Sequence, residues 1–201
     1  MFYSLPETDT EAERWAYWNG AFSEEELDEI SVICKELTLE PSTITGMDNM
    51  TEEEAAAMRN NNVAWLPPTK RTDFIYKVFS KTISKVNSAH FRFDLSGMFE
   101  ELQYSEYAVG EHFNAWHADN FDGGMPTYDL PRKFTLSMQM SRPEEYEGGD
   151  LQLRYGQTPV TAERNHGHMV FFPSTTLHRV KPVTKGMRKS LVAWAGGPRF
   201  R

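Results

Sequence analysis

The second half of the sequence, from about residue 98 onward, is built of short segments rich in aromatic and β-branched residues, and this pattern limits the possible folds most strongly. The clearest of these segments read MFEELQYSEY, KFTLSMQM, DLQLRY, HMVFFP and KSLVAWA. Between them lie the stretches VGE, DGGM, EGGD and NHG, which are typical of turns. Many short strands joined by turns predict an antiparallel sandwich or barrel in this half of the chain.

The first ninety residues have a different, helical pattern. Ser23 and Glu26 form a capping box that opens one helix, and Thr51 and Glu54 repeat it before a second, shorter helix. A third helix is predicted over residues 72–86, where apolar residues recur at helical spacing. The apolar positions of the first predicted helix are Leu27, Ile30, Ile33, Cys34 and Leu37.

The length of 201 residues is sufficient for one domain with a sizeable core and short for two. Helices followed by many short strands predict an α+β fold. We therefore expect a single domain, residues 1–201, in which a helical part over about 1–95 supports a β-core over about 96–201.

The charge balance argues against two classes of partner. Lys and Arg number 21 against 29 Asp and Glu, which gives a net charge of −8. Nucleic acid and anionic membranes both require basic surface, so neither is an expected partner. The sequence shows no secretion signal and no run of about 18 apolar residues. Its one cysteine, Cys34, lies in the apolar stretch ISVIC, so we expect a buried thiol in a cytoplasmic protein.

One of the six histidines has a carboxylate two positions later, in the stretch WHADN. On a strand, His117 and Asp119 would point to the same face and offer one nitrogen and one oxygen to a metal ion. A further histidine from a distant strand would complete a two-histidine, one-carboxylate triad, which suits non-haem Fe(II) that activates dioxygen. The alternative is a surface histidine paired with an aspartate.

The candidates for the third ligand are His166, His168 and His178. Arg188 lies ten residues after His178, behind a turn at Gly186, and a hairpin of this length would return it to the same cavity. An inward-facing arginine requires an anion, and its guanidinium suits a carboxylate. The alternative for Arg188 is a solvated residue at the edge of a sheet.

Three stretches together are similar to a known family: QYSEYAVGEHFNAWHADN, YEGGDLQL and GHMVFFPSTTLHRVKPVTKGMRKSLVAW. They resemble the Fe(II)/2-oxoglutarate-dependent dioxygenases of the prolyl 4-hydroxylase type, particularly the microbial PKHD-type hydroxylases. The resemblance implies a double-stranded β-helix, or jelly-roll, core. It also implies Fe(II), 2-oxoglutarate as cosubstrate and dioxygen, with ascorbate as an additional candidate.

The resemblance assigns roles to individual residues. It implies that His117, Asp119 and His178 are the iron ligands and that Arg188 binds the C5 carboxylate of 2-oxoglutarate. The other residues implied to lie at the site are Tyr107 and Gln139, as cosubstrate contacts, and Trp194, which would pack behind the metal.

The resemblance also implies the reaction, which is hydroxylation of a peptidyl proline in a peptide or protein partner with release of succinate and carbon dioxide. A free amino acid or small metabolite is the alternative substrate, and a jelly-roll binding module without chemistry is a further alternative. Nucleic-acid demethylation is disfavoured, because the strand LVAWA lacks the extra arginine of those relatives. The segment 120–133 differs from the family and is either a lid over the site or a surface loop.

Overall fold

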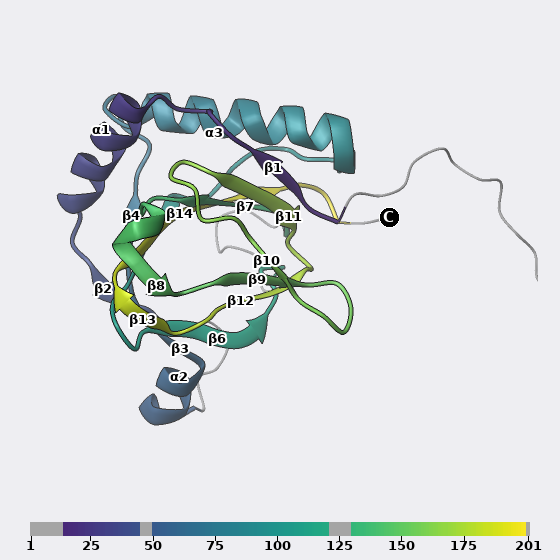
Figure 1. Ribbon diagram of the computed structural model, residues 1–201. Coiled ribbons are helices and arrows are strands. Elements are labelled where there is room, and N and C mark those ends of the chain that lie inside the picture. Colours follow the sequence, from purple (N-terminus) through teal and green to yellow (C-terminus); the bar gives the residue numbers. More distant parts are fainter. Residues whose placement is uncertain (1–13, 45–49, 121–129, 200–201) are drawn as a thin grey trace, which may run out of the picture.

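Two antiparallel sheets form the two central layers of the computed structural model, which describes residues 14–44, 50–120 and 130–199 (Figure 1). In the larger sheet the strand order is β1-β11-β7-β14-β5-β4-β2, and in the smaller sheet it is β10-β9-β12-β6-β3. The strands of the larger sheet are β1 (Ala16–Trp18), β2 (Glu40–Pro41), β4 (Asn62–Leu66), β5 (Leu102–Tyr107), β7 (Arg132–Gln139), β11 (Met169–Pro173) and β14 (Arg188–Gly196). Those of the smaller sheet are β3 (Arg59–Asn60), β6 (His112–His117), β9 (Leu151–Arg154), β10 (Val160–Thr161) and β12 (Leu177–Val180). A separate pair consists of β8 (Tyr146–Gly148) and β13 (Val183–Gly186).

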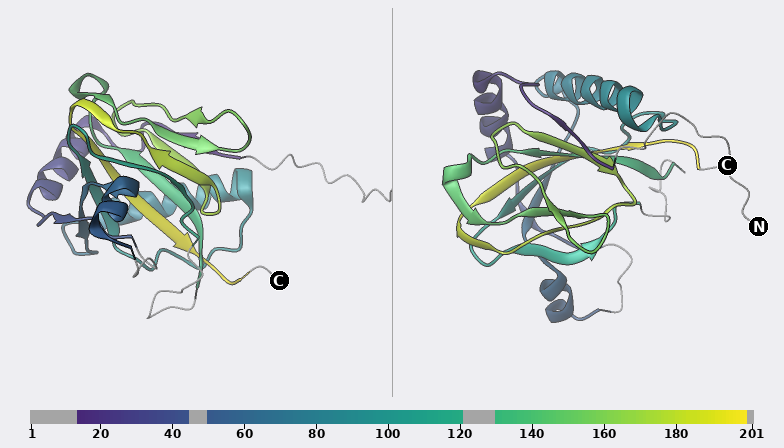
Figure 2. Two further views of the ribbon diagram at one scale, coloured as in Figure 1. Left: turned by 90° about the horizontal axis from the view of Figure 1, so that it is seen from below. Right: turned by 45° about the vertical axis from the view of Figure 1, so that its right-hand side comes forward.

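The three predicted helices are confirmed as α1 (Glu24–Lys35), α2 (Glu52–Met58) and α3 (Asp73–Val86). Both predicted capping boxes are present at the starts of α1 and α2. Helices α1 and α3 lie on the side of the larger sheet, and α2 lies on the opposite side of the molecule (Figure 2). Among the residues that the structure describes, no helix is long and apolar enough to cross a membrane.

The main hydrophobic core lies between these helices and the larger sheet. Ile30 of α1 and Phe79 of α3 are fully buried there against Phe134 and Leu136 of β7. Cys34 belongs to the same cluster, and burial raises the pKa of its thiol to about 12. The side chain is 1% exposed, which confirms the prediction of a buried thiol.

The opposite face of strand β7 is also buried, but it is polar. One face of β7 points to the helices and carries Phe134, Leu136 and Met138. The other face points between the two sheets and carries Thr135, Ser137 and Gln139. The inner face of a β-sandwich is normally filled with apolar side chains. Buried polar residues in this position indicate that the space between the sheets holds a polar site.

The N-terminal part contains strands as well as helices, which corrects the prediction that the first ninety residues are helical. Strand β4 pairs with β5, and β3 pairs with β6, so this part extends both sheets. These strands are short, and their partners are distant in the sequence, which is why local periodicity missed them. The jelly-roll core buttressed by helices is otherwise as expected, with an α+β content.

The connection between His178 and Arg188 is not the predicted hairpin, because it crosses from one sheet to the other. The chain leaves β12 in the smaller sheet, pairs with β8 through β13, and only then enters β14 in the larger sheet. Gly186 turns this corner at φ +69°, where a Cβ atom would lie 1.9 Å from the carbonyl oxygen of Glu145. His178 and Arg188 therefore enter the space between the sheets from opposite sides, His178 from the smaller sheet and Arg188 from the larger one.

Candidate metal and cosubstrate site

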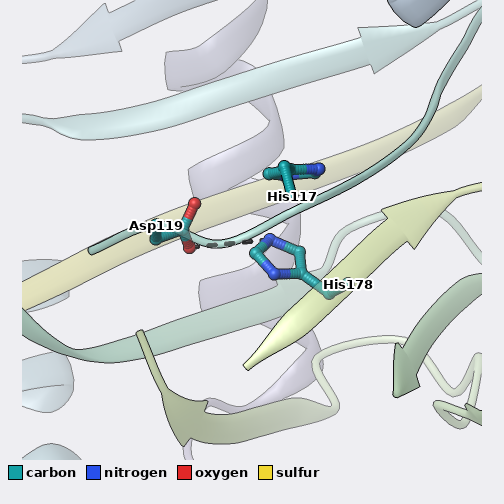
Figure 3. Close-up of side chains that lie close together, drawn as sticks. All are labelled: His117, Asp119 and His178. Atoms are coloured by element: carbon teal, nitrogen blue, oxygen red, sulfur yellow. Dashed lines mark ion pairs between the residues drawn. The ribbon is translucent and has the colours of Figure 1, made fainter. Parts of the chain in front are cut away.

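His117, Asp119 and His178 come together at one end of the smaller sheet (Figure 3). His117 ends β6 and is the direct cross-strand partner of His178 on β12. One ligand atom from each of the three residues lies within 4.8 Å of the other two, and His178 Nε2 is 3.6 Å from Asp119 Oδ2. The structure thus confirms that these three predicted side chains converge on one point.

Backbone carbonyls fix the orientation of both imidazole rings. His117 Nδ1 lies 3.0 Å from the carbonyl oxygen of Ala115, and His178 Nδ1 lies 3.0 Å from that of Thr176. A proton on each Nδ1 satisfies these contacts and leaves each Nε2 with a free lone pair. This arrangement is typical of metal-binding histidines.

Asp119 reaches the same point from a segment outside the strand, although the sequence predicted that it lies on a strand. It lies beyond the end of β6, not within the strand, and its N–H donates to the carbonyl oxygen of Ser174 at 2.8 Å. The hydroxyl of Thr135 donates to Asp119 Oδ2 at 2.9 Å. These two bonds hold the carboxylate in place without the regular geometry of a strand.

The electrostatics of the triad favour the protonation states that bind metal. Burial lowers the pKa of the His117 imidazole to about 3, and the nearby His178 acts in the same direction. Burial alone would raise the pKa of the Asp119 carboxyl, but His178 and His117 outweigh it and hold that pKa below its ordinary value. At neutral pH His117 is therefore neutral and Asp119 is ionised, as metal coordination requires.

Replacing Thr135 with valine is expected to weaken metal binding by roughly 10- to 100-fold, because it removes the donor that orients Asp119 while it nearly preserves side-chain volume. A calorimetric titration with Mn(II) measures this loss of affinity. Thr161 on β10 is not among the residues lining the cavity, so Thr161→Val is the matched control. Equal metal affinity in wild type and Thr135→Val would show that the bond to Asp119 has no positioning role.

A cavity of about 110 Å³ lies between the two sheets and includes the triad in its lining. Arg188 enters it from the larger sheet and is only 3% exposed. Its Cζ lies 5.4 Å from the ring centroid of Tyr107, its cross-strand partner, and its Nη1 donates to Ser190 Oγ at 3.3 Å. Among the described residues, no carboxylate forms an ion pair with Arg188. A buried guanidinium of this kind is favourable only when an anion meets it.

Gln139 lies on the correct face of β7 but farther along the strand than the main cavity. It lines a smaller neighbouring cavity, where its Nε2 donates to the hydroxyl of Tyr146 at 3.1 Å. The predicted contact between Gln139 and the cosubstrate stays a prediction that this placement does not support. Arg188 lines both cavities, whereas Tyr107 lines the main one.

The other two candidates for the third ligand are directed elsewhere. His168 is 2% exposed and lines the smaller cavity, where its Nδ1 is 3.4 Å from Glu163 Oε2. His166 Nδ1 lies 3.3 Å from Glu24 Oε2 near the start of α1. The structure therefore assigns the third position of the cluster to His178.

The cavity residues that were not predicted from the sequence include two arginines, Arg59 on β3 and Arg132 on β7. Arg132 forms an ion pair with Glu100, and its Cζ lies 3.8 Å from a ring centroid of Trp194. Trp194 lines the same cavity, and its role behind the metal stays a prediction beside the alternative of an ordinary core tryptophan. The sequence signal for such a polar cavity is the alternation of polar and apolar residues on β7. The same alternation is also typical of a strand with one solvated face, so it does not identify cavity residues.

Comparison with known proteins agrees with this geometry. Residues 102–196 match the family model described as the 2OG-Fe(II) oxygenase superfamily, and the match includes all three clustered residues and Arg188. This matched segment is just under half of the chain, and over it the sequence is similar to that superfamily.

The chain is also similar in sequence to curated proteins and in fold to solved structures. A PKHD-type hydroxylase from Crocosphaera subtropica is 37% identical over 94 residues, which are 46% of this chain and 41% of that protein. The chain thus matches about two fifths of the length of such relatives. A Pseudomonas putida prolyl-4-hydroxylase superimposes with a TM-score of 0.69 at 17% identity, over 92% of each chain. A prolyl hydroxylase from Trichoplax adhaerens, solved with a peptide fragment of hypoxia inducible factor, gives 0.70 at 16% identity, over 90% of this chain and 83% of that one.

The residues present fit the two groups that the superfamily's name contains. Two imidazole nitrogens and one carboxylate oxygen are a donor set that suits Fe(II) with open coordination positions. At the other side of the cavity, Arg188 is a buried cation without a carboxylate partner among the described residues, as a dicarboxylate such as 2-oxoglutarate requires.

Proposed function

We propose that this chain is a 2-oxoglutarate-dependent hydroxylase that acts on a peptidyl proline and releases succinate and carbon dioxide. The observation that carries the proposal is a cavity shared by two groups. The three candidate metal ligands line it on the side of the smaller sheet, and Arg188 enters it from the larger sheet. A dicarboxylate can therefore approach the metal at one end while its other end pairs with a fixed guanidinium.

In this proposal one group of residues binds the metal and Arg188 binds the cosubstrate. His117, Asp119 and His178 would hold Fe(II), which when bound supplies the activation of dioxygen for hydroxylation of a C–H bond. Arg188 orients the cosubstrate, and its bond to Ser190 reduces the freedom of its side chain before the cosubstrate arrives.

Aromatic rings pack against both histidines of the triad. The ring of Phe113 stacks on His117 with centroids 3.5 Å apart and an interplanar angle of 8°. Phe172 lies 4.9 Å from the ring of His178. These contacts also restrict both imidazoles, so the ligand geometry is set before the metal binds.

The names of the relatives support a proline substrate. The PKHD-type and prolyl hydroxylases are similar to this chain, and the protein from Trichoplax adhaerens holds a peptide. A free amino acid or small metabolite is the second candidate, and the observation that favours it is Arg59, a further arginine in the cavity without a carboxylate partner among the described residues. The predicted lid or surface loop at 120–133 lies mostly outside the described residues.

The test is mass spectrometry of a substrate panel. The protein is incubated with Fe(II), 2-oxoglutarate and ascorbate together with proline-rich peptides, free proline or free lysine. The gain of one oxygen atom on a peptide proline, accompanied by an equal amount of succinate, is the expected result. Oxygen gain on free amino acids alone would move the function to the second candidate. Absence of 2-oxoglutarate turnover under every condition would contradict both.

A further inference from the structure

Arg59 enters the cavity from the smaller sheet, on the same side as the metal cluster. It pairs with Phe113 across strands β3 and β6, and its Cζ lies 4.7 Å from the centroid of the Phe113 ring. The Phe113 ring also stacks on His117, one of the three candidate metal ligands, with centroids 3.5 Å apart. One aromatic ring therefore contacts both the Arg59 guanidinium and a candidate metal ligand.

The bonds of Arg59 fix its position but do not neutralise its charge. Its Nε donates to Asn61 Oδ1 at 2.9 Å, and its Nη1 donates to the carbonyl oxygen of Thr43 at 3.4 Å. Asn61 is itself buried, with 3% of its surface exposed, so the anchor is rigid. Both acceptors are uncharged. Among the described residues, no carboxylate forms an ion pair with Arg59, and burial lowers the pKa of its guanidinium, so the charge is only partly solvated.

With Fe(II) and 2-oxoglutarate bound, the cavity would offer Arg59 no unpaired negative charge. Asp119 is the one carboxylate among the described residues that line the cavity, and Arg132 is neutralised by Glu100. Fe(II) bound to Asp119 would carry one net positive charge, and 2-oxoglutarate paired with Arg188 would carry one net negative charge. These two units balance each other. The positive charge of Arg59 then remains as the excess charge of the cavity.

We infer that Arg59 binds a carboxylate of the substrate, so that this oxygenase acts on molecules that carry a carboxylate close to the carbon that is hydroxylated. The inference rests on the proposed function and deepens it by defining the substrate class. Two sources supply this chemistry: an acidic residue next to the hydroxylated residue of a peptide, or the α-carboxylate of a free amino acid. A guanidinium held by Asn61 and stacked on Phe113 presents its remaining N–H groups in a plane, which suits a carboxylate better than a single carbonyl oxygen.

The test measures binding in the absence of turnover. Protein loaded with Mn(II) and 2-oxoglutarate under nitrogen is titrated with ligand pairs that differ only in the carboxylate, with tryptophan fluorescence as the readout. One pair is a peptide with glutamate after proline and its glutamine counterpart, and the other is free proline and prolinamide. We expect the carboxylate member of at least one pair to bind roughly 10- to 100-fold more tightly. The pair that shows the difference identifies the source.

The variant Arg59→Gln should remove this preference by weakening the carboxylate ligand and leaving its amide counterpart nearly unchanged. Arg59→Lys, which keeps the charge and loses the planar fork, should retain part of it. Arg154→Gln is the matched control, because Arg154 is an arginine on the same sheet that stacks on Trp116 and does not line the cavity. It should bind all ligands as wild type does.

Two results overturn the inference and can be told apart. Binding of 2-oxoglutarate to the Mn(II) protein is measured first, and its absence would contradict the proposed function together with the role of Arg59. If 2-oxoglutarate binds but neither pair shows a preference for the carboxylate, or Arg59→Gln weakens both members of a pair equally, the role of Arg59 alone is wrong.

Discussion

Replacing His178 with alanine is expected to abolish tight metal binding and all 2-oxoglutarate turnover. The side chain supplies one of the two imidazole nitrogens in the triad, and it is 6% exposed. Loss of a residue that only orients a ligand costs about 10- to 100-fold in affinity, and loss of a ligand itself should exceed that range. Calorimetric titration with Mn(II) measures the affinity, and succinate release measures turnover.

The control for this prediction is His112→Ala. His112 lies on the same strand as His117, and its Nδ1 accepts a bond from the backbone N–H of Asn114 instead of facing the cavity. Circular dichroism establishes that both variants are folded. Metal affinity that survives in His178→Ala, or that falls equally in His112→Ala, would contradict the assignment of the triad.

Replacing Arg188 with glutamine is expected to raise the concentration of 2-oxoglutarate needed for half-maximal turnover by roughly 100-fold, since removal of one partner from a buried charge pair costs about 2–5 kcal/mol. Metal affinity measured without 2-oxoglutarate should change little, because Arg188 lies on the opposite sheet from the histidines. This separation of effects distinguishes a cosubstrate contact from a general loss of structure.

The control is Lys185→Gln, which removes a basic residue from the same connection. Lys185 is exposed and pairs with Glu147 outside the cavity, so its loss should leave the 2-oxoglutarate requirement unchanged. Arg188→Lys should be intermediate, because lysine keeps the charge and loses the bidentate geometry. A wild-type titration curve for Arg188→Gln would remove Arg188 from the cosubstrate site.

Much of the fold could be predicted because its signals are local. The capping boxes at Ser23 and Thr51 predict where α1 and α2 begin, and apolar spacing predicts α3. Strands β3 and β4 could not be predicted in this way. They are stabilised by pairing with β6 and β5, which lie 36 to 54 residues away, and nothing in their own sequence requires this pairing.

The candidate site was predictable where residue type and spacing carry the chemistry. His117, Asp119, His178 and Arg188 were found because few residue types bind metal or a carboxylate, and the structure brings all four to one cavity. Arg59 was missed because a single arginine in a polar stretch looks like a solvated residue until its neighbours are known.

The sequence also could not predict how far along a strand a site residue lies. Thr135, Ser137 and Gln139 share one face of β7, but Thr135 bonds to Asp119 while Gln139 bonds to Tyr146 in a different cavity. Alternation predicts which face a residue occupies and not which part of that face. The contact with Asp119 therefore becomes visible only when the register between β7 and its neighbours is known.

The central claim is that one cavity couples the His117, Asp119 and His178 cluster to a dicarboxylate held by Arg188. The most direct measurement is succinate release from 2-oxoglutarate by the wild-type protein, with Fe(II) and with a chelator, in the presence of the substrate panel. Succinate that forms with Fe(II), stops with the chelator and rises with at least one panel member is the predicted result. No succinate under any condition, in protein that binds no divalent metal, would contradict the claim and reduce the cluster to a buried hydrogen-bonded group.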